Sequence, residues 1–210
     1  MLPLVSFLAA GTLFWFCGWI FWILFYSSFF IIGLWVLRHN PGLIEERMVG
    51  FKSNEPTWDK AYSILIFILF SIWLIFTPLD AVRFHWSQMP TWLHVVGVIV
   101  VSCSFCLLYL TFRENPYLSS AVRIQEDRGQ TVVSTGPYRY VRHPMYAGGL
   151  LFFLASGLLL GSWIGVFLGF LLVGILARRA MREERELRTG LKGYDAYMAQ
   201  VKYRLIPHVW

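Results

Sequence analysis

The sequence feature that most constrains the fold is a series of long apolar runs. Residues 1–37 carry no charged side chain, and further apolar runs cover residues 61–79, 91–112, 145–160 and 163–177. A helix needs about 20 apolar residues to cross a bilayer. Only 14% of the chain is charged, whereas a soluble domain carries about 25%. We therefore expect an all-α integral membrane protein with about five transmembrane helices.

The first apolar run is longer than one span requires, at about 1.5 Å per residue. No Pro or Asn marks a turn in its middle, which favours one long helix over a helical pair bending near Gly18 or Ser27. Residues 1–112 then form an N-terminal part with three spans, or four if the first run is a pair. Residues 113–210 form a second part with a cofactor-binding loop, a helical hairpin and a charged tail.

The polar loops carry local signals of their own. Residues 40–42 read Asn-Pro-Gly, a turn signal, and residues 45–47 are suited to start an interfacial helix. Such a segment either covers a site at headgroup level or is a plain connector. In the longest loop, residues 122–125 and 130–133 alternate around Asp-Arg-Gly, which predicts a short β-hairpin.

The last two apolar runs predict a tight helical hairpin. The run that follows Pro144 reaches only to Leu160, and a Gly-Ser pair separates it from the next run. The final helix continues beyond the membrane through the charged residues 178–188 and ends near Gly190 and Gly193. A short amphipathic piece with two tyrosines follows.

The distribution of basic residues predicts the orientation and the partners. The net charge of +6 suggests nucleic acid only at first sight, because the basic residues lie in the loops between apolar runs. Lys and Arg number four, one and five in successive loops and eight in the tail, so the positive-inside rule places the tail in the cytoplasm. We expect contact with anionic lipids and no nucleic acid partner. Asp80, Arg83 and His85 are expected at the opposite interface.

The three cysteines do not form a pattern for metal binding or disulfide formation. Cys17, Cys103 and Cys106 lie inside apolar runs, and no nearby histidine or second pair completes a ligand set. We expect buried free thiols and no metal site.

The richest cluster of polar, aromatic and glycine residues is the stretch 135–149. Pro144 is suited to open a helix, so Arg142 and His143 would stand beside free backbone N–H groups. Gly148 and Gly149 would allow a ligand or a neighbouring helix to approach closely. These residues alone leave two interpretations open, an anion site or a basic membrane anchor with small-residue helix packing.

A second charged cluster leaves the membrane on the same predicted side. Glu183 and Glu184 are adjacent, and residues spaced by four, such as Arg179 and Glu183, form helical pairs. Some of these charges are expected to form simple salt bridges. Two neighbouring acids are also suited to accept hydrogen bonds from ribose hydroxyls or an amino group, while an arginine orients an anionic substrate.

Together these motifs resemble a known family. The stretch Gly-Pro-Tyr-Arg-Tyr-Val-Arg-His-Pro-Met-Tyr-Ala-Gly at 136–148, the pair Glu183-Glu184, the Gly-Tyr-Asp-Ala-Tyr of 193–197 and the Arg-Leu-Ile-Pro of 204–207 are similar to those of membrane-embedded methyltransferases. This group contains the isoprenylcysteine carboxyl methyltransferases and the phospholipid N-methyltransferases. The resemblance covers roughly the last 80 residues.

The resemblance implies S-adenosylmethionine as cofactor, bound between the hairpin and the tail. It implies these cofactor-binding residues: Tyr138, Arg142, His143, Tyr146, Gly148, Gly149, Glu183, Glu184, Arg204, Leu205 and Pro207. The residues from Arg204 to Pro207 would help to close the adenine pocket. Arg179 and Glu184 are the candidates for catalysis, Arg179 to aim a carboxylate and Glu184, or else His143, as a base.

The resemblance implies a lipid-like or prenylated acceptor that enters sideways from the bilayer. Carboxylate O-methylation is favoured, with N-, S- or other O-methylation as alternatives, because a carboxylate needs no general base whereas a phenol, amine or thiol does. Two other classes compete with methyl transfer. One is a nicotinamide-dependent membrane reductase with a similar hairpin, and the other is a non-catalytic scaffold. The sequence does not specify an oligomeric state.

Overall fold

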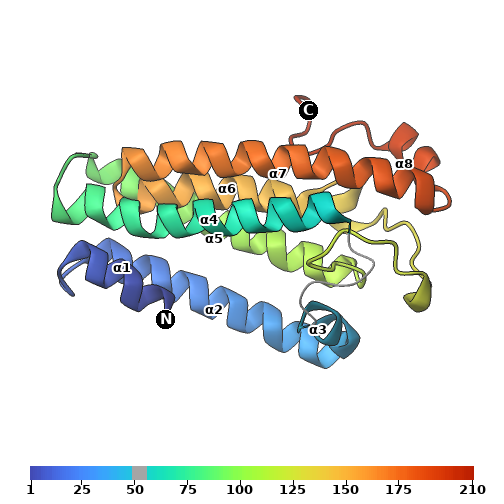
Figure 1. Ribbon diagram of the computed structural model, residues 1–210, viewed down its shortest axis with the longest axis horizontal. Coiled ribbons are helices and arrows are strands. Elements are labelled where there is room, and N and C mark those ends of the chain that lie inside the picture. The colour runs from blue at the N-terminus through green and yellow to red at the C-terminus, as the bar shows by residue number, and fades with distance from the viewer. Residues whose placement is uncertain (49–55) are drawn as a thin grey trace.

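In the computed structural model, which describes residues 1–48 and 56–210, these residues form helices and loops and no strand (Figure 1). The long helices are α2 (Phe16–His39), α4 (Thr57–Pro78), α5 (Thr91–Glu114), α6 (Pro144–Leu160) and α7 (Trp163–Gly190). The short helices are α1 (Leu2–Ala10), α3 (Pro41–Met48) and α8 (Tyr194–Gln200). A π-helical turn, η1 (Leu79–Arg83), continues α4, and the two 3-10 turns are η2 (Glu126–Arg128) and η3 (Gly136–Arg139).

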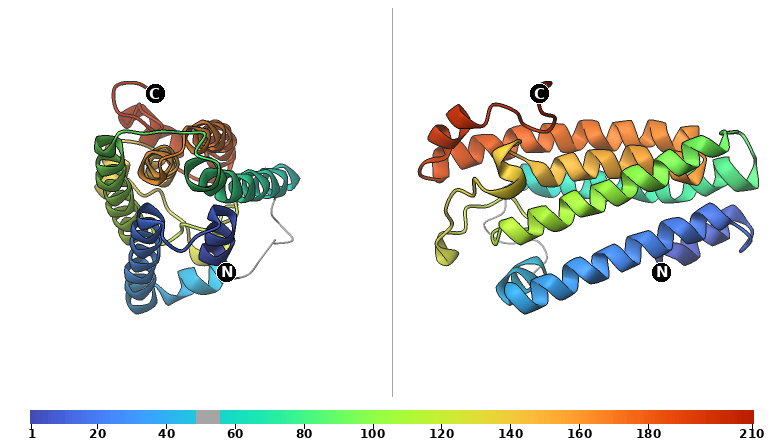
Figure 2. Two further views of the ribbon diagram at one scale, coloured as in Figure 1. Left: turned by 90° about the vertical axis from the view of Figure 1, so that its left-hand side faces the viewer. Right: turned by 180° about the vertical axis from the view of Figure 1, so that it is seen from behind.

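The long helices run side by side along the length of the molecule (Figures 1 and 2). Helices α2, α4 with η1, α5 and α7 are long and apolar enough to cross a membrane, and α6 is a shorter apolar helix. This confirms an all-α, multi-pass membrane architecture. We call the end that holds α3, α8 and the loop between α5 and α6 the pocket end, and the end that holds η1 and the α6–α7 turn the closed end.

The prediction of one long helix over residues 1–37 is wrong, because α1 and α2 form a pair. Gly11 ends α1 in the left-handed conformation with φ 73°, and its N–H donates to the carbonyls of Phe7 and Leu8. Such a glycine closes a helix as well as a proline does. The turn therefore lies earlier than either predicted bend, and Gly18 lies inside α2, where it accommodates the Trp15 ring.

Aromatic side chains fill the space between α2, α4, α5 and α6. The largest core cluster includes Phe21, Trp22, Trp73, Phe105 and Phe152, all buried. The Trp73 indole N–H donates to the carbonyl of Gly165 at 3.1 Å, so its polar atom is satisfied inside the apolar interior.

The helices approach one another more closely at the closed end than at the pocket end. A Cβ on Gly97 of α5 would overlap the backbone of Leu159 on α6, and one on Gly169 of α7 would lie 2.7 Å from the carbonyl oxygen of Phe153. Toward the pocket end, a Cβ on Gly148 would meet only the Leu108 side chain, at 2.9 Å, and the Ser104 carbonyl, at 3.7 Å. Small residues therefore bring helix backbones into contact at one end.

A buried carboxylate organises the closed end, which corrects the expectation that Asp80 is interfacial. Asp80 is fully buried, and its Oδ2 accepts hydrogen bonds from the Ser87 hydroxyl at 2.6 Å and the Ser162 hydroxyl at 2.5 Å. The backbone N–H of Ile164 donates to the same oxygen at 3.3 Å. Asp80 thus fixes the start of α7, where a helix N-terminus favours negative charge.

The cysteines are free, but the expectation that all are buried is wrong. Cys103 and Cys106 lie exposed on α5, on the outer surface of the bundle. Cys17 is half-buried, with its Sγ 3.6 Å from Nδ1 of His94.

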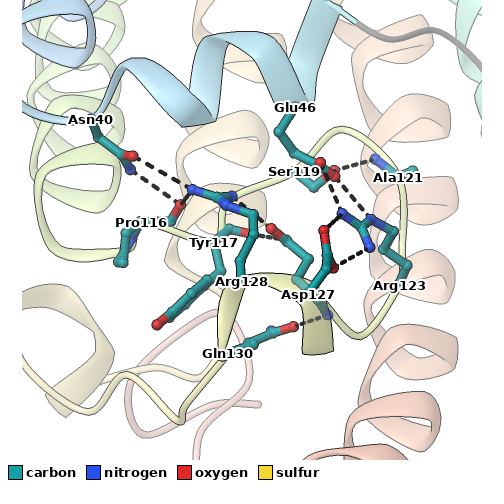
Figure 3. Close-up of polar contacts among 11 residues, drawn as sticks. Asn40, Glu46, Pro116, Tyr117, Ser119, Ala121, Arg123, Asp127, Arg128 and Gln130 are labelled. Atoms are coloured by element: carbon teal, nitrogen blue, oxygen red, sulfur yellow. Dashed lines mark hydrogen bonds and ion pairs between the residues drawn. The ribbon is translucent and has the colours of Figure 1, made fainter.

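At the pocket end, α3 begins at Pro41 and packs against the loop between α5 and α6 (Figure 3). The side chain of Glu46 accepts hydrogen bonds from Arg123 and Ser119 of that loop. The helix predicted to begin near residue 45 is therefore real and starts earlier. Part of the predicted connector, residues 49–55, lies outside the described residues.

The β-hairpin predicted around residues 122–133 is wrong. Among the described residues, one backbone hydrogen bond joins the two predicted strands 122–125 and 130–133, from the Gln130 N–H to the Gln125 carbonyl. The Gln125 N–H donates to the Gln130 side chain. The Val122 N–H is taken by Asp59 of α4. Because side chains satisfy these backbone groups, the alternating pattern does not form a ladder.

Candidate active site

The motif of residues 135–149 contains the N-terminus of α6, and the helix begins at Pro144 as the sequence predicted. Pro144 is at the first turn of the helix and His143 is its N-cap. The backbone N–H groups of Arg142 and His143 donate to the carbonyls of Tyr203 and Arg204, each at 2.9 Å. The C-terminal tail is therefore paired with the motif and lies beside it.

Glu184 is the centre of a buried charge network. Its carboxylate accepts hydrogen bonds from Arg142, at 3.2 and 3.3 Å, and from Arg204, at 3.0 and 3.4 Å. The Nε2 of His143 lies 3.5 Å from the same carboxylate. Arg142 also donates to the carbonyls of Val201 and Lys202 at 2.7 and 2.8 Å. One carboxylate thus joins the motif, α7 and the tail.

The neighbouring acid makes a different contact. The Tyr146 hydroxyl donates to Glu183 Oε2 at 2.7 Å, across 37 positions of sequence. The guanidinium carbon of Arg179 lies 5.9 Å from the centre of the Tyr146 ring. The motif and the acidic pair therefore meet in space, as the resemblance implies.

Arg179 is paired with a residue that sequence reasoning missed. Its Nε and Nη2 donate to the carboxylate of Asp59 at 2.7 and 3.1 Å, and its Nη2 donates to the Ser120 carbonyl at 2.8 Å. Asp59 is fully buried in the first turn of α4. The only sequence signal for it is one acid placed directly before an apolar run.

Three tyrosines surround the network. The Tyr138 hydroxyl accepts a hydrogen bond from Asn115 at 2.7 Å, and the Tyr197 hydroxyl donates to the Tyr138 carbonyl at 2.8 Å. Burial raises the pKa of Tyr138, and burial together with the charge of Glu184 raises the pKa of Tyr194. Both hydroxyls therefore keep their protons at physiological pH.

These side chains line one recess, which we call the polar pocket. Its walls include Tyr138, Arg142, His143, Tyr146, Arg179 and Glu183, with the loop residues from Ser119 to Gln125 opposite and Tyr194 and Tyr197 at one side. The pocket encloses about 90 Å³. Two buried polar atoms on its walls, His143 Nε2 and the Tyr194 hydroxyl, make no hydrogen bond within the described residues.

A second recess, which we call the apolar groove, lies on the other side of the Gly136–Val141 stretch. It encloses about 580 Å³. It is lined mainly by apolar residues of α5, α6 and the tail: Leu107, Leu110, Ala147, Leu150, Leu151, Leu205, Ile206 and Pro207. The exposed Arg113 and Arg139 also line it.

The predicted site residues therefore divide into four groups. Tyr138, Arg142, His143, Tyr146, Arg179 and Glu183 line the polar pocket, and Leu205 and Pro207 line the apolar groove. Glu184 and Arg204 form the network behind the polar pocket. Gly148 and Gly149 face side chains of α5 and α7, so they serve as contact points between helices.

The fold and the site together define a multi-pass membrane protein with a charged pocket beside an apolar groove. Residues 92–190 match the family model described as phospholipid methyltransferase. This match covers just under half of the chain. It shows that this part is similar to integral membrane methyltransferases and indicates an enzyme of methyl transfer. The matched stretch runs from α5 to the end of α7 and contains the motif and the acidic pair, but neither Asp59 nor the tail.

Proposed function

We propose that the polar pocket binds S-adenosylmethionine and that the enzyme methylates a lipophilic acceptor held in the apolar groove. The observation that carries this proposal is the meeting of the motif and the acidic pair, more than 35 positions apart, on the walls of one pocket. The family match supports methyl transfer over the reductase and scaffold alternatives.

The residues of the polar pocket fit this cofactor chemically. S-adenosylmethionine supplies an electrophilic methyl group on a sulfonium centre. Tyr138, Tyr146 and Tyr197 offer aromatic surfaces for a ring or a cation, and Glu183 offers acceptors for hydroxyl or amino groups. The Tyr194 hydroxyl makes no hydrogen bond within the described residues, and His143 Nε2 has only the long 3.5 Å contact to Glu184, so these are the polar atoms best placed to bind a ligand. The walls must move apart to admit a molecule of nucleoside size.

Glu184 acts as an organiser in this proposal. Two guanidinium groups and an imidazole surround its carboxylate, which stabilises the negative charge and makes it a weak base. Its role is to hold Arg142 and Arg204, and thereby the tail, against the motif. If the acceptor needs a base, His143 is the better candidate, because its imidazole lines the polar pocket and its only nearby acid is Glu184, 3.5 Å from Nε2 within the described residues.

The apolar groove supports a lipid-like acceptor with an anionic group. Its floor is formed by side chains that match an acyl or prenyl chain, and two exposed arginines, Arg113 and Arg139, border it. Arg179, the residue expected to aim a carboxylate, is already paired with Asp59. We therefore assign the orientation of an acceptor carboxylate to Arg139, and favour carboxyl O-methylation over transfer to nitrogen or sulfur.

The orientation follows from the charge distribution. The pocket end holds the loops and the tail that carry nearly all the basic residues, whereas Arg83 lies in η1 at the closed end. The positive-inside rule then places the polar pocket at the cytoplasmic face.

The binding half of this proposal is tested by calorimetry of S-adenosylhomocysteine with the purified protein in lipid nanodiscs. The wild type is expected to bind, and His143→Ala and Glu184→Ala are expected to lose binding. Asp195→Asn is the matched control, because Asp195 forms an exposed ion pair with Arg188 away from both recesses. Normal binding in both alanine variants would overturn the site assignment, and tight NADPH binding in its place would restore the reductase alternative.

The acceptor is identified by incubating the protein with radiolabelled S-adenosylmethionine and fractionated host lipids. Base-labile label in an apolar species indicates a carboxyl methyl ester. Label that is stable to base indicates N-, S- or ether O-methylation and would contradict the preference for a carboxylate. Arg139→Gln is expected to raise KM for an anionic acceptor without changing the affinity for S-adenosylhomocysteine.

A further inference from the structure

Asp59 lies outside the stretch that matches the methyltransferase family, yet it is connected to the polar pocket. It comes from the first turn of α4, and its carboxylate is fully buried. It does not line the pocket itself, but it contacts two residues that do, Arg179 and Val122.

The carboxylate of Asp59 joins three separate parts of the chain. Its two oxygens accept hydrogen bonds from Arg179 of α7, and Oδ2 also accepts the Val122 N–H at 2.8 Å. Arg179 in turn donates to the Ser120 carbonyl at 2.8 Å. The backbone of residues 120–122 is therefore fastened between an acid of α4 and an arginine of α7.

Stability alone does not account for such a pair. Removing two charges from water costs several kcal/mol per ion, and apolar residues of similar volume often stabilise a protein equally well. The ion pair also positions the groups around it. It holds the Arg179 guanidinium beside the Tyr146 ring and fixes the loop segment that forms the opposite wall of the pocket.

A second clamp from the N-terminal half holds the same wall. Glu46 of α3 accepts hydrogen bonds from Arg123 at 2.9 Å and from the Ser119 hydroxyl at 3.1 Å (Figure 3). Arg123 is also paired with Asp127 within the loop. Glu46 of α3 thus holds the wall formed by residues 119–123 at Ser119 and Arg123, and Asp59 of α4 holds it between them at the Val122 N–H.

We propose that Asp59 is a positioning residue of the methyltransferase, which sets the loop wall of the polar pocket by holding Arg179 and the Ser120–Val122 backbone. The proposal rests on the assignment of the cofactor to this pocket. The pocket is narrow, so a ligand must displace the loop wall to enter. The hydrogen bonds of Asp59 then bring residues 120–122 back to their position and so slow the release of the ligand. The N-terminal helices therefore contribute to the cofactor site without touching the cofactor.

This role predicts a specific kinetic signature for Asp59→Asn. The amide preserves the shape but places an N–H group where an oxygen faces the guanidinium. The dissociation rate of S-adenosylhomocysteine is expected to rise about tenfold to a hundredfold, as misplacement of a site element does, while the association rate does not fall. A purely structural role would instead reduce the fraction of active protein and leave the dissociation rate unchanged.

The experiment measures both rates by stopped-flow in wild type, Asp59→Asn, Arg179→Gln and the double variant. If Asp59 acts through Arg179, the double variant is no worse than the more affected single variant. Hydrogen exchange of the peptide 115–133 should increase in Asp59→Asn, because a single amide oxygen cannot accept from both sides of the Arg179 guanidinium and from the Val122 N–H as the carboxylate does. Asp195→Asn serves as the control with unchanged rates.

The outcomes separate the two proposals. Absence of S-adenosylhomocysteine binding in the wild type overturns the proposed function. Binding in the wild type with an unchanged dissociation rate and unchanged exchange in Asp59→Asn overturns only the positioning role. If Asp59→Asn does not fold, Arg179→Gln and the conservative Asp59→Glu give the same readouts, and wild-type dissociation rates in both variants contradict the proposal.

Discussion

The continuous helix formed by α4 and η1 carries a buried aspartate near each end, and the two are held in different ways. Asp59, at the pocket end, faces the guanidinium of Arg179. Asp80, at the closed end, faces two serine hydroxyls and the start of α7. Both carboxylates are fully buried. One end matches charge with charge, and the other spreads a single charge over neutral donors.

This difference follows the position of the two recesses, which both lie at the pocket end of the bundle. The pocket end contains arginines, acids and tyrosines around recesses, and its ion pairs connect elements far apart in sequence. The closed end is sealed by backbone contacts at glycines and by a turn with local hydrogen bonds. In the proposed function, the Asp59–Arg179 ion pair holds a loop that moves when a ligand binds. The hydrogen bonds of Asp80 hold the α6–α7 turn, which does not need to move.

The largest expected effect is from Asp59→Ala, which leaves a buried guanidinium without its acid. Breaking a buried ion pair in this way costs about 3–5 kcal/mol. The free energy of unfolding, measured by denaturant titration in mild detergent, should fall by that amount. The Asp59→Ala, Arg179→Met double variant should recover part of the loss. If it is no more stable than the single variant, the unpaired charge is not the cause.

Asp80→Ala should cost less, because only neutral donors lose their acceptor. Unsatisfied buried donors cost about 1–3 kcal/mol. Asp80→Asn should be milder still, since an amide oxygen accepts the same hydrogen bonds, and it should leave S-adenosylhomocysteine binding unchanged. The same titration compares it with Asp59→Asn. Equal losses of stability at the two positions would remove the distinction between the two ends.

The glycine contacts supply a third comparison. Gly97→Ala would place a methyl group against the Leu159 backbone, and overpacking of this kind costs about 1–3 kcal/mol. Gly174→Ala, on α7, meets nothing within 4 Å and should be neutral or slightly stabilising. Thermal unfolding in nanodiscs measures both. A harmless Gly97→Ala would show that the helices at the closed end can separate.

The smallest effect is expected from Asp195→Asn. This carboxylate forms an exposed ion pair with Arg188 at 2.8 Å, and solvent-exposed pairs contribute little to stability. We expect no measurable change in unfolding or in ligand binding at physiological salt. A clear loss of binding would place α8 in the site more directly than its contacts indicate.

Sequence reasoning identified the elements whose signals are local. The apolar runs, the break at Gly161–Ser162 and the proline that opens α6 each act within a few residues, and the structure has all three. The meeting of the motif with the acidic pair was expected from the resemblance alone. Sequence reasoning failed where a partner lies far along the chain: no pattern near Asp59 points to Arg179, 120 positions away.

Two other misses have the same cause. The alternating residues near Val122 would suit a hairpin, but a distant carboxylate takes the backbone N–H that a ladder needs. Asp80 follows an apolar run, where an interfacial carboxylate is normal, and only the fold brings Ser162 to it. The helical pair of α1 and α2 was missed for a local reason, since the possible bends considered were Gly18 and Ser27 and not Gly11, where α1 ends.

The two anchored aspartates also have a mechanical consequence for α4. An axial slide by one helical turn, about 5.4 Å, would detach Asp59 from α7 and Asp80 from the α6–α7 turn at the same time. Rotation about the helix axis would do the same. This helix is therefore held at a fixed position along its axis by contacts near both of its ends. Changes in bilayer thickness are then met by tilting of the whole bundle.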